Sequence, residues 1–234
     1  MKILGFDSAG KTAGVAVWQD GTILYEANLR AGLTHSQTLL PLCRQALAQT
    51  GLSLDDVDLL AFNLGPGSFT GLRIGLAAAK GLCFSRGIPC VGVSTLESLA
   101  YSLPVEGNVV CALDARRREV YAAAFCRKDG AVMRVCADEA MPVERLEPVL
   151  QTIHGPVYLM GDGAALVQEA FSSKFVFQPL EPFARLGGAE GICLCAAQHK
   201  DEAVQADVLT PDYLRLSQAQ RERAQRLSEQ QSEQ

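Results

Sequence analysis

The sequence predicts an α/β fold built from two related lobes. Short strand-like apolar runs alternate with longer helix-like runs, and glycine-rich turns separate them. The pattern at the start of the chain returns about 100 residues later, which indicates a domain duplication rather than a short repeat. Apolar residues make up 48 % and charged residues 20 % of the 234 residues. This balance is typical of a folded protein with a sizeable core.

The first half of the chain is expected to open with three strands. Asp20 and Gly21 favour a hairpin turn between the second and third strands, because glycine tolerates positive φ. A helix fits residues 36–50, where Pro41 is either a kink or the true start. The elements expected after it are a strand at 59–64, a helix at 70–82, a strand at 90–93 and a helix at 96–101.

The second half repeats the first. Residues 109–133 lay over residues 3–24, and each run has an apolar strand that ends in aspartate, at Asp7 and Asp114. Residues 157–171 then repeat the strand, glycine turn and helix of residues 59–75. We therefore expect an N-terminal lobe at 1–104 and a second lobe at 105–216, whose C-terminal helix could pack back on the first. The polar tail at 217–234 is expected to be disordered.

The composition excludes several classes of protein. The formal net charge of −5 leaves no basic surplus for direct nucleic-acid binding. No apolar run approaches the roughly 20 residues that a membrane span needs, and the N-terminal apolar run is too short for a signal peptide. We expect a cytoplasmic protein without membrane contact. Its eight cysteines are then best explained as buried thiols.

Residues 5–12 match the pattern G-x-x-x-x-G-K-[ST] of a phosphate-binding loop. That loop works at the N-terminus of a helix, whereas the residues that follow here, AGVAVWQDG, indicate a strand and a turn. We expect the match to be accidental. A phosphate could still meet this turn in another geometry, so Asp7, Gly10, Lys11 and Thr12 remain candidate nucleotide or phosphate ligands.

The aspartate that ends the repeated strand, Asp114, is expected only to order its own turn. The three arginines at 116–118 would crowd a nucleotide there.

The helix expected at 70–82 carries a stripe of small residues. Gly71, Gly75 and Ala78 fall on one face, and Leu82 closes it. Each glycine inside a helix costs about 1 kcal/mol relative to alanine, so a compensating close contact is expected. Three readings stay open: packing within the chain, packing against another subunit, or an anion at residues 65–70.

No catalytic set and no metal site are predicted. The three histidines, His35, His154 and His199, do not suggest three converging ligands.

Six segments together resemble the bacterial TsaB (YeaZ) family. They are GPGSFTGLRIG at 65–75, VGVSTLESLA at 91–100, LDARRREVY at 113–121, PDYLR at 211–215, ILGFDSA at 3–9 and THSQTLLP at 34–41. The resemblance implies a duplicated actin/Hsp70-like fold with mixed sheets flanked by helices. It implies a non-catalytic subunit, with no cofactor, in the transfer of threonylcarbamoyl to N6 of the adenosine beside the anticodon, in tRNAs that read codons starting with A.

The resemblance also implies partners. They are a TsaD-like catalytic subunit and a TsaE-like ATPase, with tRNA reached only through the complex and a homodimer possible in isolation. TsaD-like proteins carry two metal-binding histidines where this chain has Thr95 and Leu99, so the transferase chemistry is not expected here.

The subunit contact of that family uses two helices, which favours a partner for the small-residue stripe. The residues we assign to the interface are His35, Leu39, Leu42, Phe69, Gly71, Leu72, Gly75, Leu76, Ala78 and Leu82. If the stripe contacts a partner, Gly75→Trp is expected to weaken binding to the TsaD-like subunit and to leave the monomer folded. The alternative function is a stand-alone ATP-dependent phosphotransferase of the same fold, with Asp7 and the turn at 10–12 holding magnesium and phosphates.

Overall fold

The computed structural model describes residues 1–30, 32–182 and 184–215, and it contains two five-stranded sheets. The tail predicted to be disordered at 217–234 lies outside the described residues. The strands of the first sheet are β1 (Lys2–Asp7), β2 (Ala13–Gln19), β3 (Thr22–Leu29), β4 (Leu59–Gly65) and β5 (Cys90–Ser94). Those of the second are β6 (Gly107–Arg116), β7 (Glu119–Lys128), β8 (Ala131–Arg134), β9 (Glu139–Pro142) and β10 (Val157–Met160).

The two sheets share one topology. In the first, the order is β3-β2-β1-β4-β5, with β1 antiparallel to β2 and parallel to β4. In the second, β8-β7-β6-β10 follows the same path, with β6 antiparallel to β7 and parallel to β10. β9 pairs with β7 beside this path. The repeat in the sequence is therefore a repeat of structure, and the duplicated actin-like fold class is confirmed.

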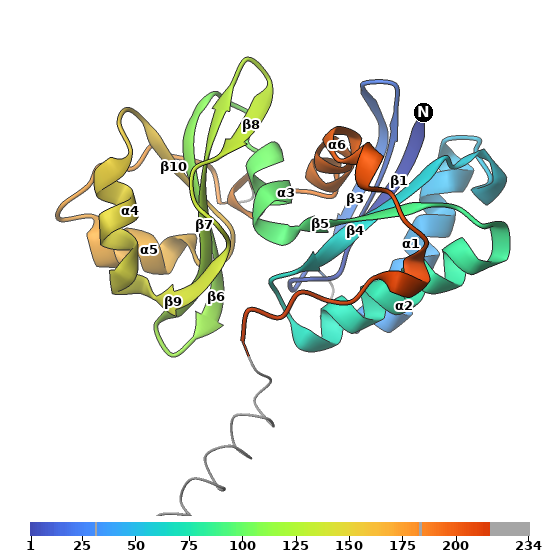
Figure 1. Cartoon of the computed structure of the whole chain (residues 1–234), viewed down its shortest axis with the longest axis horizontal. Coiled ribbons are helices and arrows are strands. Elements are labelled where there is room, and N and C mark those ends of the chain that lie inside the picture. Colours follow the sequence, from blue (N-terminus) through green and yellow to red (C-terminus); the bar gives the residue numbers. More distant parts are fainter. Residues whose placement is uncertain (31, 183, 216–234) are drawn as a thin grey trace, which may run out of the picture.

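The helices lie in layers around and between the sheets, as Figure 1 shows. They are α1 (His35–Gln49), α2 (Phe69–Arg86), α3 (Thr95–Tyr101), α4 (Glu147–Thr152), α5 (Ala164–Phe171) and α6 (Glu190–Gln198). Short 3-10 turns are η1 (Leu54–Asp56), η2 (Val143–Leu146), η3 (Ala184–Leu186), η4 (Lys200–Glu202) and η5 (Ala206–Val208). None of the helices in the described ranges is both long and apolar enough to cross a membrane.

Two helix boundaries differ from expectation. α1 begins at His35, so Pro41 lies inside the helix rather than at its start. α2 continues to Arg86, four residues beyond the expected end, and stops where Gly87 adopts a left-handed φ of 64°. At its start, the Ser68 side chain caps the helix by accepting a hydrogen bond from Gly71 N at 3.3 Å.

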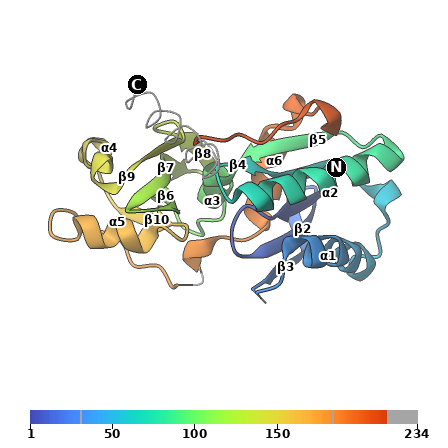
Figure 2. The same cartoon turned by 90° about the horizontal axis from the view of Figure 1, so that it is seen from below.

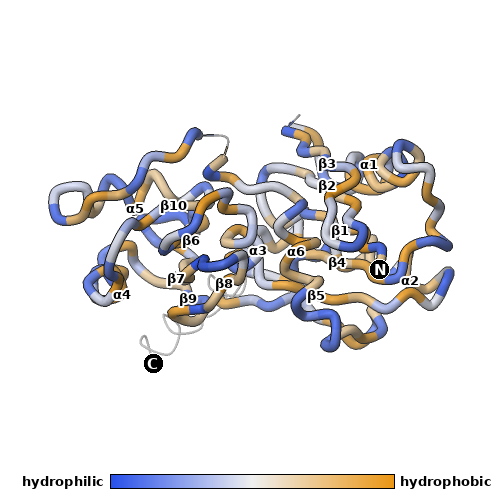
Figure 3. Tube along the Cα trace, turned by 90° about the horizontal axis from the view of Figure 1, so that it is seen from above, coloured by the Kyte–Doolittle hydropathy of each residue, from blue (hydrophilic) through white to orange (hydrophobic). Residues whose placement is uncertain are grey.

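Alternate residues of the first sheet face two different helix layers, because successive side chains of a strand point to opposite faces. Leu4 and Phe6 belong to the core that includes α1 and α2, whereas Ile3 packs with residues of α6. Figure 2 shows α1 and α2 side by side on the first sheet. Hydrophobic residues colour much of β4 and β5 in Figure 3.

The layer between the sheets consists of α3 and α6. Leu96 and Leu103, from α3 and the turn after it, pack with Phe125 of the second sheet, while α6 packs on β1, β2, β4 and β5. The C-terminal helix therefore lies on the first sheet although it follows the second in sequence. The lobe boundaries at 104 and 105 stay a prediction. All eight cysteines are free, and six of them are buried.

Candidate functional site

A cavity of about 240 Å³ lies between the lobes. All four residues predicted as nucleotide or phosphate ligands line its first-lobe wall: Asp7, Gly10, Lys11 and Thr12. Leu113, Gly161 and Asp162 form the opposite wall. The cavity is also lined by Thr95 and Leu99 of α3, Arg30 and Leu186. Nucleotide binding by these residues stays a prediction.

The carboxyl group of Asp7 is already held by groups of its own lobe. Its Oδ1 accepts hydrogen bonds from Ala9 N at 2.8 Å and from Asn63 Nδ2 at 2.9 Å. Burial raises the pKa of Asp7, and these hydrogen bonds partly oppose the rise. Asp7 therefore orders the turn after β1.

The backbone after this turn shows whether residues 5–12 form a phosphate-binding loop. Residues 13–19 form strand β2 rather than a helix. Strand β2 thus stands where the phosphate-loop pattern requires a helix, and the rejection of that motif is confirmed.

In the turn after Asp114, an aspartate again accepts a hydrogen bond from a backbone N–H two residues later, and three successive arginines have positive φ. Asp114 Oδ1 accepts a hydrogen bond from Arg116 N at 2.8 Å, which confirms its role in ordering the turn. Arg116, Arg117 and Arg118 all adopt left-handed φ angles, at 67°, 57° and 59°. Such φ values are unfavourable for residues with a side chain. The Arg116 guanidinium also pairs with Asp114 at 3.2 Å, as expected for a surface ion pair.

Five of the ten residues assigned to the partner surface point into the chain's own core. Leu39, Leu72 and Leu76 are 1 %, 2 % and 9 % exposed. A Cβ atom at Gly71 would overlap the backbone oxygen of Ser8, and one at Gly75 would overlap the Ser8 hydroxyl. The glycines therefore allow α2 to approach the turn after β1.

The assignment of these five residues to a partner surface is therefore corrected. Leu39, Leu72 and Leu76 are buried in the chain's own core, and Gly71 and Gly75 contact Ser8. The contact with Ser8 also corrects the expected effect of Gly75→Trp, which would disrupt the monomer itself.

Two further assigned residues are occupied within the chain. His35 Nε2 donates a hydrogen bond to Gly10 O at 2.8 Å and so ties α1 to the turn of the cleft. Phe69 stacks on Tyr213, with ring centroids 4.4 Å apart and an interplanar angle of 14°. The remaining three, Leu42, Ala78 and Leu82, are partly exposed at the edge of the core.

The side of α2 that faces solvent differs from the side that carries Gly71 and Gly75. Residues three or four apart share one face of an α-helix, so Ile74, Ala77, Gly81 and Phe84 form one stripe, in which Ala77, Gly81 and Phe84 are exposed. Phe84 is 92 % exposed, and Leu33 and Leu40 are 58 % and 47 % exposed. We call this surface the outer face; its residues are Leu33, Leu40, Ile74, Ala77, Gly81 and Phe84.

A family model described as "TsaD: tRNA N6-adenosine threonylcarbamoyltransferase" matches residues 30–223. The Escherichia coli (strain K12) protein named tRNA threonylcarbamoyladenosine biosynthesis protein TsaB is 36 % identical over 167 residues, which are 70 % of this chain and 72 % of that protein. The chain belongs to the TsaB (YeaZ) family. It also falls within the wider family that the matched model describes, and the resemblance seen in the six segments is confirmed.

Other TsaB proteins extend the match over nearly the whole chain. The protein of the same name from Bacillus subtilis (strain 168) is 29 % identical over 233 residues, covering 94 % of this chain and 96 % of that one. The solved structure described as YeaZ from Pseudomonas aeruginosa has a TM-score of 0.77 at 29 % identity, and the match covers 91 % of this chain and 99 % of that one.

The PDYLR segment of this TsaB-family chain has a structural role that the sequence did not reveal. Asp212 N donates to Leu64 O at 2.8 Å, and the ring of Tyr213 covers Phe69. Arg215 reaches the second lobe, where it donates to Ala115 O at 3.0 Å. The segment therefore fastens α2 and connects the two lobes, and Figure 1 shows it running past α2 in red.

The cleft of this TsaB-family chain lacks the donor set of a metal site at α3. Thr95 and Leu99 lie one helical turn apart and both line the cavity. A leucine side chain offers no ligand atom. Thr95 is 5 % exposed, and its buried hydroxyl has no hydrogen-bond partner among the described residues.

Proposed function

We propose that this chain works in the biosynthesis of threonylcarbamoyladenosine in tRNA as a non-catalytic subunit of a TsaD-like transferase. The names of its relatives and the description of the matched family model support the pathway. In this role the chain would present a binding surface to the catalytic subunit.

The observation that carries the proposal is the apolar outer face. A helix that is apolar nearly all round is normally covered on every side. The inner side of α2 packs on the first sheet, yet Ile74, Ala77, Gly81 and Phe84 face outward. Small residues in the middle of this face would allow a partner helix to approach closely. An apolar face of this kind marks an interaction site.

The non-catalytic part of the proposal is supported by the cleft. Asp7 and Asp114 each order their own turn, and Leu99 offers no metal ligand. A TsaD-like partner would therefore supply the transfer chemistry.

The remaining partners belong to the same proposal. A TsaE-like ATPase would join the assembly in the cytoplasm, and tRNA would be reached through the complex because the chain has a net charge of −5. Without its partner, the outer face could pair with a second copy of the chain.

The test is co-elution of the purified chain with the TsaD-like subunit from the same organism. Ala77→Arg places a long charged side chain in the centre of the outer face, and Ala131→Arg is the matched control at an exposed alanine in β8. We expect Ala77→Arg to abolish co-elution and to lower tRNA modification, while Ala131→Arg changes neither. Full co-elution of the Ala77→Arg chain refutes the proposed surface.

A second function, ATP-dependent phosphotransfer, is favoured only by the lining of the cleft, where Lys11 and Thr12 lie beside Asp7. An adjoining cavity of about 340 Å³ shares Gly10, Lys11, Leu113 and Asp162 with it, so the volume does not decide between the two functions. Calorimetry with Mg-ATP on the isolated chain separates the two functions, since a non-catalytic subunit gives weak or no heat of binding.

A further inference from the structure

A cluster of metal-ligating side chains lies outside the cleft, where α3 meets the end of α6. Glu97, Cys195 and His199 each offer one ligand atom, and the three atoms lie within 4.8 Å of one another. We propose that these three residues form a binding site for a zinc ion. This site is separate from the two α3 positions that line the cleft, Thr95 and Leu99, and it does not depend on the proposed function.

The chain brings the three side chains together in two steps. Cys195 and His199 are four residues apart at the end of α6, so they lie on the same side of that helix. Glu97 is in the first turn of α3, which Ser94 fixes by accepting a hydrogen bond from Glu97 N at 3.2 Å. Because α3 packs directly on α6, the carboxyl group of Glu97 meets both ligands of α6.

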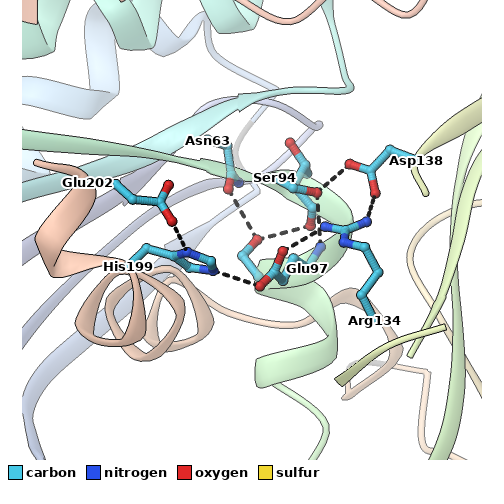
Figure 4. Close-up of polar contacts among 9 residues, drawn as sticks. Asn63, Ser94, Glu97, Arg134, Asp138, His199 and Glu202 are labelled. Atoms are coloured by element: carbon cyan, nitrogen blue, oxygen red, sulfur yellow. Dashed lines mark hydrogen bonds and ion pairs between the residues drawn. The ribbon is translucent and has the colours of Figure 1, made fainter. Parts of the chain in front are cut away.

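Neighbouring side chains hold Glu97 and His199 in place, as Figure 4 shows. His199 Nδ1 is hydrogen-bonded to Glu202 Oε1 at 2.8 Å, and Nε2 faces Glu97 Oε1. A carboxylate on the second ring nitrogen is the usual support of a metal-binding histidine. Arg134 donates to Glu97 Oε2 at 2.6 Å, so Oε1, which pairs with His199 Nε2, is the oxygen that would bind the ion.

The distances require only small side-chain movements. Glu97 Oε1 and His199 Nε2 are 2.9 Å apart. A tetrahedral zinc ion, with bonds of about 2.0–2.2 Å to nitrogen and oxygen, holds such atoms roughly 3.4 Å apart. The Cys195 sulfur lies within 4.8 Å of both atoms and would be the third ligand. Water would fill the fourth position, because the ring of His199 is one-third exposed.

The donor set selects zinc over the hard cations. Thiolate and imidazole are ligands of zinc and other transition metals, whereas magnesium and calcium take oxygen ligands. Zinc would displace the proton of the Cys195 thiol, which is released to water, and would bind the neutral imidazole of His199. The ion would fasten the end of α6 to α3, beside the second-lobe residues Arg134 and Asp138.

The test is titration of the reduced, metal-free full chain with cobalt(II), followed by displacement with zinc. A thiolate ligand gives an intense sulfur-to-cobalt absorption band in the near ultraviolet. We expect this band to saturate at one equivalent, to disappear in Cys195→Ser and to remain in Cys193→Ser. Cys193 is the matched control because it lies in the same helix but directs its sulfur to Ala16 O, at 3.7 Å.

Two variants at exposed or partly exposed positions keep the test valid if Cys195→Ser does not fold. Glu202→Gln removes the support of His199 and should lower zinc affinity by roughly 10- to 100-fold, measured against a chromophoric chelator. His199→Gln should lower it further. Absence of the band in the wild-type chain, or equal zinc affinity in all variants, would mean that the cluster is only an ion-pair network and would overturn the proposal.

Discussion

The strongest prediction concerns Phe84, the most exposed large apolar side chain of the outer face. At 92 % exposure, its ring makes almost no contact within the chain. Phe84→Ala should therefore leave the free energy of unfolding within about 0.5 kcal/mol of the wild-type value. Its affinity for the TsaD-like subunit should nevertheless fall, because the partner would cover the ring.

The size of the loss follows from the exposed area. Burying a phenylalanine side chain that is otherwise fully exposed contributes roughly 1.5–3 kcal/mol. This range corresponds to an increase in Kd of roughly 10- to 150-fold. Val176→Ala is the matched control, since Val176 is 85 % exposed but lies in the second lobe.

The assay is calorimetric titration of each variant with the TsaD-like subunit, together with urea unfolding of each variant alone. We expect a large change in Kd without a change in stability for Phe84→Ala, and no change in either for Val176→Ala. Equal Kd values for the two variants would refute the assignment of Phe84 to the interface.

Three further predictions concern the fold. Gly71→Ala should destabilise the monomer by roughly 1–3 kcal/mol in urea unfolding, because the added methyl group meets the backbone of Ser8; an unchanged midpoint would contradict this. Tyr213→Ala should cost about 0.5–1.5 kcal/mol for the lost ring pair beyond its buried area, and Tyr213→Phe should restore it. Burial and the adjoining Glu26 carboxylate raise the pKa of Glu190 to about 8. The folded chain thus holds this proton more tightly than the unfolded chain does. The stabilising effect is complete below pH 4.5 and is lost as the pH rises through about 8. Glu190→Gln should flatten that decline in a series of thermal melts, and an identical slope would exclude Glu190 as its source.

The repeat of the sheet topology could be predicted from the sequence because it depends on local patterns. Strand periodicity, the Asp-Gly turns and the aspartates at the ends of β1 and β6 recur in order along the chain. Each of these features depends only on residues that are close together in the sequence. The two lobes could therefore be recognised without knowledge of their tertiary contacts.

The inward and outward sides of α2 could not be separated in this way. Leucine, alanine and glycine occur on both sides, so hydrophobic periodicity does not distinguish Gly75 from Ala77. Only the tertiary contact of Ser8 with Gly71 and Gly75 shows which side is inside.

The zinc-ligating cluster was missed for a related reason. The four-residue spacing of Cys195 and His199 is visible in the sequence, but two residues alone do not make a site. Glu97 lies far away in sequence, and only the packing of α3 on α6 brings it to them.

Reconstituted tRNA modification tests the proposed non-catalytic role most directly. Unmodified tRNA would be incubated with the threonylcarbamoyl donor and with this chain alone, the TsaD-like and TsaE-like subunits alone, or all three, and the modified nucleoside would be quantified by mass spectrometry. We expect product only when this chain is combined with the TsaD-like subunit. Modification by this chain alone, or undiminished modification without it, would contradict the account.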